Sequence, residues 1–347
     1  MSSLEKTQLA LGFMPLSDCA PLVVAKELGF FQQQGLDVML LRQNSWATLR
    51  DKLHAGLLDA AQMLAPMPFA SHVGSGVEAL PMRAPFVLSY NGNGITLSKA
   101  LFDEVCEQLQ MPAEEVLLEP VAASTLAAVI AKRVQCGEKL KFATVFPFSC
   151  HYYQLTQWLE QGGIDLKDVE ISIIPPSGMV TALADKLIDG FCVGSPWNAA
   201  AVRLDIGATI LTSNDIWPGQ PEKVLGVTKQ WQEQHPNTLI ALTDALRQAS
   251  EWLKPVPNRF EVARWLCQAQ YLNTELDVVA PALIGSCLTK TGVKPRDVID
   301  HTLFSVKGQS NELSIEQGQW LLQQMQANGH IPTTAVHEKV LREVITN

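Results

Sequence analysis

The chain has 347 residues, of which 47% are hydrophobic and 18% charged, and its formal net charge is −9. This length is sufficient for two globular lobes with their own cores. The low, acidic charge offers no extended basic surface, which argues against direct binding of nucleic acid. No apolar run is long enough to cross a bilayer.

The seven cysteines are odd in number and form no CxxC pair and no metal-type cluster. Most of them stand in apolar stretches, where a free cysteine behaves as a small hydrophobic residue. This pattern is typical of a reducing compartment.

Short apolar runs alternate with helical patterns in the first half of the chain, which is typical of a mostly parallel α/β sheet. We expect strands at 9–14, 36–41 and 60–64, and helices at 20–28 and from Ser45 to about residue 58. Asp18 and Ser45 are the expected N-cap residues of the two helices, because short polar side chains accept bonds from the first helical N–H groups.

A turn-rich stretch at 89–94, Ser-Tyr-Asn-Gly-Asn-Gly, predicts a crossing between two lobes. A new α/β pattern follows, with helices at 97–110, 150–161 and 179–188 and strands at 141–145, 170–174 and 191–193. Ser149 is the expected cap of the second of these helices. Gly194-Ser195-Pro196 then allows the chain to cross back.

After the second crossing we expect one strand at 208–212 and helices at 237–254, 259–269, 315–328 and 334–345. The sequence thus predicts an α/β protein of two lobes with a helical C-terminal tail. The first lobe comprises residues 1–93 and 195–347, and the second comprises residues 94–194. A cleft between two lobes is the usual place for a small ligand.

Four expected helix starts follow strands in the order expected of loops that face this cleft: Asp18, Ser45, Ser149 and Ser195. In open α/β sheets, ligands bind beyond the carboxyl ends of the strands. Helix N-termini at that edge offer unpaired N–H groups and a partial positive charge. The sequence therefore predicts an anion-binding site there.

Individual side chains near these helix starts suit an anion. Trp46 can stack on a planar ligand, His151 can donate a hydrogen bond, and Gly194 permits a close approach of the backbone. Lys223, expected in a loop after Trp-Pro-Gly-Gln-Pro-Glu, can supply the compensating positive charge. Each of these residues alone is more often structural, so the hypothesis depends on their joint placement.

An enzyme is less well supported by the sequence. Cys150 stands beside His151, but neighbouring residues of one helical turn point to different faces, which argues against a nucleophile–base pair. No GxGxxG follows a strand, and neither a Walker-type loop nor HExxH is present. We therefore expect a non-enzymatic binding protein that uses no cofactor and no metal.

Several segments together resemble the nitrate- and bicarbonate-binding proteins of ABC transporters. They are LGFMPLSD at 11–18, SWATLRD at 45–51, LAPMP at 64–68, FCVGSPWN at 191–198 and PEKVLG at 221–226. The resemblance runs from about residue 9 to residue 235. It implies a two-lobed fold of the periplasmic-binding-protein-like type II class.

The resemblance also implies a ligand and its contacts. The nitrate-contacting Trp, His, Gly and Lys of the family fall on Trp46, His151, Gly194 and Lys223. The family's glutamine contact falls on Asn93, a shorter amide. The bicarbonate branch carries an acidic group in place of the lysine and uses calcium, so Lys223 favours nitrate or nitrite without a metal.

Only residues 1–8 precede the first expected strand, and they lack the basic and apolar stretches of an export signal. Among relatives without such a signal, the chain most resembles the cytoplasmic nitrate/nitrite sensors of the NasS type. This implies a cytoplasmic sensor that sequesters an antiterminator protein with an ANTAR domain and releases it when nitrate binds, which regulates nitrate-assimilation genes.

Two alternatives remain open. One is the substrate-binding subunit of a nitrate ABC transporter whose export signal is missing from this sequence. The other is an enzyme on the same fold, such as a pyrimidine-precursor synthase, which needs clustered catalytic His or Cys residues that we do not find.

Overall fold

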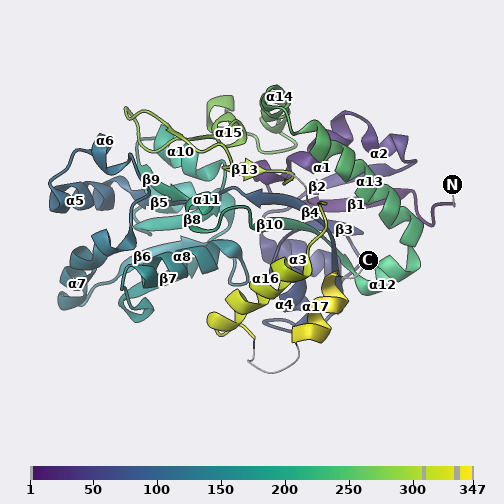
Figure 1. Cartoon of the computed structure of the whole chain (residues 1–347), viewed down its shortest axis with the longest axis horizontal. Helices are drawn as coiled ribbons and strands as arrows, with labels where there is room; N and C mark the ends of the chain where they lie inside the picture. The colour runs from purple at the N-terminus through teal and green to yellow at the C-terminus, as the bar shows by residue number, and fades with distance from the viewer. Residues whose placement is uncertain (1–2, 307–309, 332–336, 346–347) are drawn as a thin grey trace.

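The computed structural model describes residues 3–306, 310–331 and 337–345 and contains two mixed sheets, each covered by helices (Figure 1). The first sheet has the strand order β13-β4-β10-β3-β1-β2. Its strands are β1 (Gln8–Phe13), β2 (Asp37–Arg42), β3 (Ala60–Leu64), β4 (Met82–Asn91), β10 (Pro221–Thr228) and β13 (Thr302–Leu303). β1 runs parallel to β2 and β3, whereas β10 runs antiparallel to β3 and β4.

Both faces of the first sheet are buried, as the alternating side chains of β1 illustrate. Leu9, Leu11 and Phe13 point into one core, and a Cβ on Gly12 would lie 2.6 Å from Leu58 on the other side. The first face is covered by α1 (Ala20–Glu27), α2 (Phe30–Gln33), α13 (Pro236–Trp252), α14 (Val256–Leu266) and α15 (Leu276–Leu283). The second face is covered by α3 (Trp46–His54), α4 (Met67–Val73), α16 (Ile315–Ala327) and α17 (His337–Ile345).

The second sheet has the order β7-β6-β8-β5-β9. Its strands are β5 (Asn93–Ser98), β6 (Leu140–Thr144), β7 (Val169–Ile173), β8 (Gly190–Gly194) and β9 (Gly207–Thr212). A separate core joins this sheet to α5 (Lys99–Leu109), α6 (Ala113–Val116), η2 (Ala123–Leu126), α7 (Ala127–Gln135) and α8 (Cys150–Gln161). On the other side lie α9 (Met179–Ala184) and α10 (Trp197–Arg203).

The two-lobed α/β fold predicted from the sequence is confirmed, with two differences in how the chain crosses. At the first crossing, β4 and β5 form an almost continuous strand interrupted only by Gly92, whose φ of 99° favours glycine, and not a turn-rich loop. At the second, the strand expected at 208–212 in the first lobe is β9, which pairs with β5 in the second sheet. The chain returns to the first sheet only after α11 (Ser213–Ile216).

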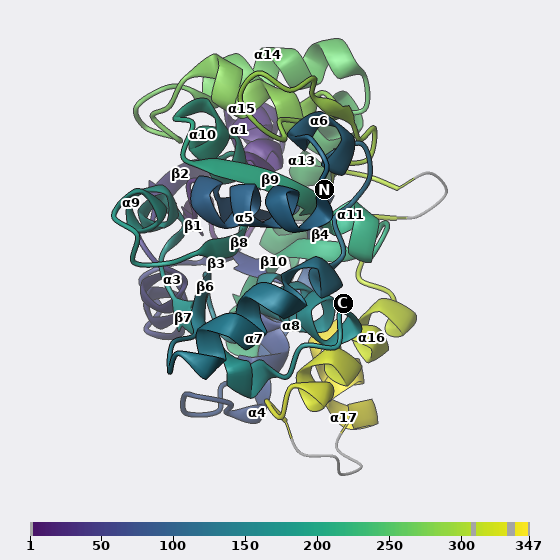
Figure 2. The ribbon, with the colours of Figure 1, turned by 90° about the vertical axis from the view of Figure 1, so that its left-hand side faces the viewer.

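The C-terminal helices belong to the first lobe but also contact the second. α17 packs on α4 and β4, and the His72 ring lies 2.8 Å from a Glu343 oxygen. After α16, Asn328 Oδ1 accepts from Thr156 of α8, and His330 Nδ1 lies 3.0 Å from the Tyr153 hydroxyl. Figure 2 shows α16 and α17, in yellow, beside α8 and α4. The tail therefore ties the lobes together on one side.

The helices expected at 237–254, 259–269 and 315–328 correspond to α13, α14 and α16 with ends shifted by up to three residues. The one expected at 334–345 corresponds to α17, and its first residues lie outside the described part of the chain. The remaining elements are η1 (Ser17–Cys19), η3 (Leu166–Asp168), η4 (Pro176–Gly178), α12 (Lys229–Gln234), β11 (Ser286–Cys287) and β12 (Arg296–Asp297).

The packing of α8 on η2 predicts the effect of one substitution. A Cβ on Gly162 would lie 2.5 Å from Ser124 N and 2.6 Å from Ala123 C, and backbone atoms cannot move aside as a side-chain end can. Gly162→Ala should therefore lower the free energy of unfolding by about 1–3 kcal/mol. Urea unfolding measures this loss.

Gly178→Ala is the matched control, because its Cβ would meet only the end of the Ile174 side chain, at 3.1 Å. Equal unfolding midpoints for the two variants would contradict the close packing of α8 on η2.

Candidate functional site

The predicted site residues meet where the parallel strands of both sheets end. Trp46 follows β2, His151 follows β6, and Gly194 is the last residue of β8. β10 and β5 run antiparallel to their neighbours, so they begin at this same edge: Lys223 pairs with Leu64 at the end of β3, and Asn93 pairs with Gly194. The topology therefore brings all five residues to one place between the lobes.

Two of the expected helix caps position Trp46 and His151. Ser45 is extended, with φ −151°, and its side chain accepts from Thr48 N at 3.1 Å, which makes Trp46 the first residue of α3. Ser149 likewise accepts from Tyr152 N at 3.0 Å, so His151 lies in the first turn of α8. Each cap satisfies one free N–H group and fixes the direction in which the helix leaves the sheet.

The other two expected helix caps are wrong. Asp18 lies within η1, and its carboxylate accepts from Gln62 Nε2 at 2.6 Å instead of binding the helix backbone. Ser195 donates to Gly92 O at 3.2 Å, and α10 begins two residues later without a side-chain cap. At Asp18 a buried polar partner competes with the helix for the carboxylate, because Gln62 stands in the middle of β3.

The expectation of Lys223 in a loop is also wrong. Lys223 is the third residue of β10, and 0% of its side chain is exposed. The pairing of β10 with β4 shifts register on both sides of Lys223, which is a β-bulge. Neighbouring residues of a regular strand point to opposite faces, but here Glu222 and Lys223 reach each other, with 2.8 Å between Oε1 and Nζ.

Lys223 is the centre of a buried ionic cluster. Its Nζ lies 2.9 Å from Asp18 Oδ2, 2.8 Å from Glu222 Oε1 and 5.7 Å from the centre of the Trp46 ring. Burial alone would lower the pKa of Lys223, but the two carboxylates outweigh burial and raise it. Burial raises the pKa of Glu222, although Lys223 opposes that shift. Lys223 therefore carries a positive charge in a site closed to water.

His151 and Asn93 border the same cluster. His151 Nε2 lies 3.4 Å from Glu222 Oε1, but neither ring nitrogen makes a hydrogen bond. Burial, and then Lys223, hold the pKa of this histidine well below its usual range, so the ring is neutral. Asn93 Nδ2 donates to Glu222 Oε2 at 2.8 Å and to Gln154 Oε1 at 2.9 Å, whereas its Oδ1 has no partner.

Gly194 leaves the approach to Asn93 open. A Cβ at this position would lie 3.4 Å from Asn93 Oδ1, 3.4 Å from Leu16 Cδ2 and 3.6 Å from Asp18 Oδ2. A larger side chain would therefore fill the space between the two lobes at this point. The bond from Ser17 N to Ser195 O, 2.8 Å long, joins the lobes beside it.

Sequence reasoning missed three members of the cluster: Gln62, Gln154 and Glu222. Gln62 had a readable signal, since it is the one polar residue in the apolar strand Ala60–Leu64. Gln154 lies one turn after His151 on α8, which places the two residues on the same side of the helix. Glu222 had no such signal, because the bulge that turns it toward the cluster is not visible in the sequence.

Several buried polar atoms around the cluster have no hydrogen-bond partner. They are Ser17 Oγ, Trp46 Nε1, Asn93 Oδ1 and both ring nitrogens of His151. Buried polar groups in proteins are almost always paired. These atoms, together with the charge of Lys223, are the groups that a small polar ligand would satisfy.

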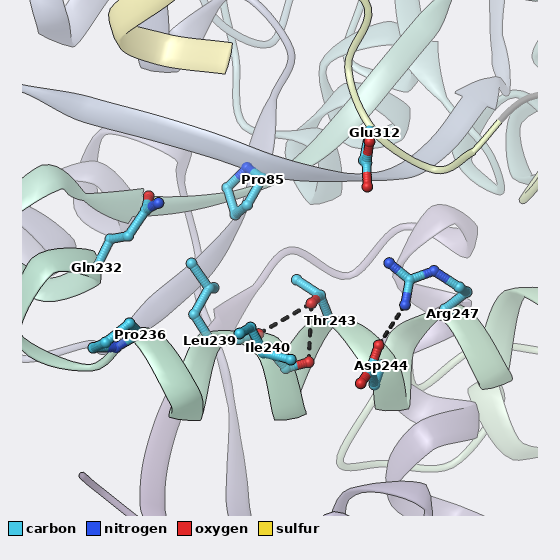
Figure 3. Close-up of a pocket in the computed structure, with 9 residues that line it drawn as sticks. All are labelled: Pro85, Gln232, Pro236, Leu239, Ile240, Thr243, Asp244, Arg247 and Glu312. Atoms are coloured by element: carbon cyan, nitrogen blue, oxygen red, sulfur yellow. Dashed lines mark hydrogen bonds and ion pairs between the residues drawn. The ribbon is translucent and has the colours of Figure 1, made fainter. Parts of the chain in front are cut away.

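A depression on the surface of α13 is less suited to an anion (Figure 3). It is lined mainly by Leu239 and Ile240 with Pro85, and its one arginine, Arg247, is paired with Asp244 on the same helix. Glu312 contributes a further negative charge at its rim. Asp244 therefore neutralises the positive charge of Arg247 at an open, solvated position, whereas Lys223 is buried.

The part of the chain that the structure describes contains neither a metal-type cluster nor a helix that could cross a membrane. Among those residues, no three His, Cys, Asp or Glu side chains converge in a way that could hold a metal ion. None of the helices described combines the length and apolar character needed to cross a membrane.

The chain is similar to a known protein family and to several known proteins. Residues 2–267 match the NMT1-like family. The chain is 39% identical over 333 residues to the nitrate import ATP-binding protein NrtC of Synechocystis sp., covering 95% of this chain and 47% of that protein. It is 34% identical over 275 residues to the nitrate/nitrite binding protein NrtA of Nostoc sp., covering 78% of this chain and 59% of that one.

Thus the chain spans about half the length of the curated relatives that it matches. Among solved structures, the periplasmic nitrate-binding protein NrtA of Synechocystis superposes with a TM-score of 0.89 at 28% identity, covering 99% of this chain and 87% of that chain. The alkanesulfonate-binding protein SsuA of Xanthomonas axonopodis has a TM-score of 0.67 at 15% identity over 97% of this chain and 99% of that one, which is a likeness of fold alone.

The ionic cluster predicts how stability responds to loss of Lys223. Lys223→Met leaves two buried carboxylates without a cation, which should lower the free energy of unfolding by about 3–5 kcal/mol at neutral pH. Burial already raises the folded-state pKa of Glu222, and loss of Lys223 should raise it further above the unfolded value. The loss should therefore be smallest in acid, should grow as pH rises above the unfolded-state pKa, and should level off above the folded-state pKa. Urea unfolding across a pH series measures it.

The double variant Lys223→Met/Glu222→Gln should recover part of the loss, since it removes one of the unpaired charges. Lys229→Met, at an exposed position of α12, is the control and should change stability by less than about 0.5 kcal/mol. A loss that does not vary with pH would contradict the charged cluster.

Proposed function

This chain belongs to the NMT1-like family, and we propose that it is a non-enzymatic protein that binds nitrate or nitrite in the cluster around Lys223. The observation that carries the proposal is the fully buried ammonium of Lys223 beside the unpaired polar atoms of Trp46, Asn93 and His151. A buried charge is tolerated only with paired partners. An anion there would lie beside the positive charge of Lys223 in a site closed to water and would accept from the unpaired N–H groups of Trp46 and His151.

The groups around Lys223 suit a small, planar, trigonal anion. The Trp46 ring, whose centre lies 5.7 Å from Lys223 Nζ, offers a flat face, and its Nε1 has no other acceptor. A neutral His151 has one N–H to donate toward an oxygen of the ligand. The N-termini of α3 and α8 direct N–H groups and a partial positive charge to the same side.

The relatives support this ligand class. Two proteins called nitrate/nitrite binding protein NrtA, from Nostoc and Synechococcus, are 34% and 32% identical to this chain. The ATP binding in the name of NrtC is not carried over, because this sequence has no Walker-type loop. The family's glutamine contact would be provided by Asn93, which the structure places beside Gly194 in the cluster.

Calorimetric titration with nitrate and nitrite tests the binding. We expect one anion per chain, and Lys223→Met should weaken binding by about a hundredfold or more, because it removes the only cation of a desolvated site. Lys229→Met is the matched control and should bind as the wild type does, since it alters an exposed lysine outside the cluster. No heat with either anion would contradict the proposal.

Beyond binding, we propose that the protein is a cytoplasmic sensor that sequesters an ANTAR-domain antiterminator. All seven cysteines are free, and four of them are buried, which suits a reducing compartment. The cluster is built from both lobes, so an anion within it favours one arrangement of the lobes. If the antiterminator binds more tightly to the arrangement of the lobes without the anion, anion binding releases it.

The second candidate is a transporter binding subunit, favoured by relatives whose names describe nitrate import or binding. A pull-down of the cellular partner with and without nitrate separates the two. The sensor predicts an RNA-binding antiterminator that nitrate releases, whereas a transporter subunit predicts a permease. Lys223→Glu should abolish the nitrate response in either case, while Lys229→Glu should keep it. An antiterminator retained in nitrate would contradict the sensor.

A further inference from the structure

The charges of the buried cluster do not balance. Lys223 supplies one positive charge, whereas Asp18 and Glu222 supply two carboxylates at 2.9 and 2.8 Å from its Nζ. His151 adds no positive charge, because its ring is neutral. An anion entering this site would leave two negative charges uncompensated and away from water, which is strongly unfavourable.

We propose that anion binding in this cluster is coupled to the uptake of one proton by Glu222. The inference rests on the proposed function. A proton from solvent converts the Glu222 carboxylate to a neutral carboxylic acid, so Asp18 and Lys223 remain as a balanced pair. The anion then adds a single negative charge. The N–H groups of Trp46, His151 and the helix N-termini are the donors available to it.

The surroundings of the two carboxylates distinguish Glu222 from Asp18 as the proton acceptor. Asp18 accepts from Gln62 Nε2 at 2.6 Å, lies 2.9 Å from Lys223 Nζ, and stands at the start of η1 and α1, where the partial positive charge of a helix N-terminus favours a carboxylate. Glu222 also has two donors, Lys223 Nζ and Asn93 Nδ2, each at 2.8 Å, but it lies within the strand β10, and burial raises its pKa. Glu222 is therefore the carboxylate that takes up the proton more readily.

Apart from Asp18 and Lys223, the titratable groups beside Glu222 are Cys150, His151 and Cys192, and they are neutral. Cys150 of α8 and Cys192 of β8 are fully buried, and burial followed by the nearby Glu222 charge raises the pKa of both thiols well above the usual range. His151 of α8 is uncharged for the reasons given above. No thiolate or imidazolium competes for the proton or balances the charge in its place.

The same proton changes what Asn93 offers to the ligand. Its Nδ2 donates to two acceptors, while its Oδ1, an acceptor without a partner, lies 3.4 Å from the position of a Cβ on Gly194. A protonated Glu222 is a donor, so a half turn of the Asn93 amide lets Oδ1 accept from it, and a matching half turn of the Gln154 amide lets Gln154 Nε2 donate to the same oxygen. The Asn93 NH2 group then lies on the Gly194 side, where the anion needs a donor.

Calorimetric titration with nitrate in buffers of different ionisation heat counts the protons taken up per anion. As pH rises through the Glu222 pKa of the free protein, uptake should rise toward one, and above that pKa the affinity should fall about tenfold per pH unit. Infrared difference spectra should show the carbonyl band of a protonated carboxylic acid when nitrate is added, and Glu222→Gln should lack this band.

Glu222→Gln should bind nitrate without proton uptake and with an affinity independent of pH. Asp18→Asn should also lose the uptake, because Glu222 then pairs with Lys223, so it tests the charge balance even if the first variant does not fold. Glu233→Gln, which alters an exposed carboxylate on α12, is the control and should behave as the wild type.

Two results would overturn the inference and leave the proposed function intact. One is nitrate binding by the wild type without proton uptake at any pH, and the other is proton uptake that persists in Glu222→Gln. Absence of nitrate binding at every pH would instead overturn the proposed function, and the inference with it.

Discussion

A lysine that is fully buried between two lobes is the constraint on which the rest of this structure depends. An unpaired ammonium away from water is not tolerated, so the fold brings Asp18 from one loop and Glu222 from a strand to within 2.9 Å of Lys223. Gln62, in the middle of β3, in turn holds Asp18 with a bond of 2.6 Å. These polar groups occupy positions that a simple hydrophobic core would fill with apolar side chains, and the proposed anion site depends on them.

The topology makes this cluster possible without long loops. Parallel strands end at one edge of each sheet, and the antiparallel β5 and β10 begin at that same edge. Residues near the starts of β5 and β10 therefore meet Trp46 and His151, which follow β2 and β6, and Gly194, the last residue of β8. The bulge around Lys223 then turns two consecutive side chains to the same face. A regular strand would have sent Glu222 to the opposite side, and the cluster would lack its second carboxylate.

The sequence was sufficient for the fold and for the main positions of the site, because both depend on local patterns. Strand alternation, serine caps such as Ser45 and Ser149, and glycines at strand ends are read directly from neighbouring residues. The partners of Lys223 depend instead on a register shift and on contacts over long sequence separations, such as that of Asp18 with Gln62. The sequence therefore predicts a loop at Lys223 and gives no signal for Glu222.

Contacts in two places link the state of the cluster to the arrangement of the lobes. Within the cluster, Asp18, Trp46 and Lys223 belong to the first sheet and its connections, whereas Asn93, His151 and Gly194 belong to the second. On the outside, His330 and Asn328 of the C-terminal tail contact Tyr153 and Thr156 of α8, the same helix that carries His151. A movement of α8 away from Lys223 must therefore also break the contacts of the tail. An anion in the cluster would contact both His151 of α8 and Lys223, and so would keep α8 close to Lys223. Because α8 also contacts the C-terminal tail, the surface formed by α8 and the tail would differ between the anion-bound and the free forms.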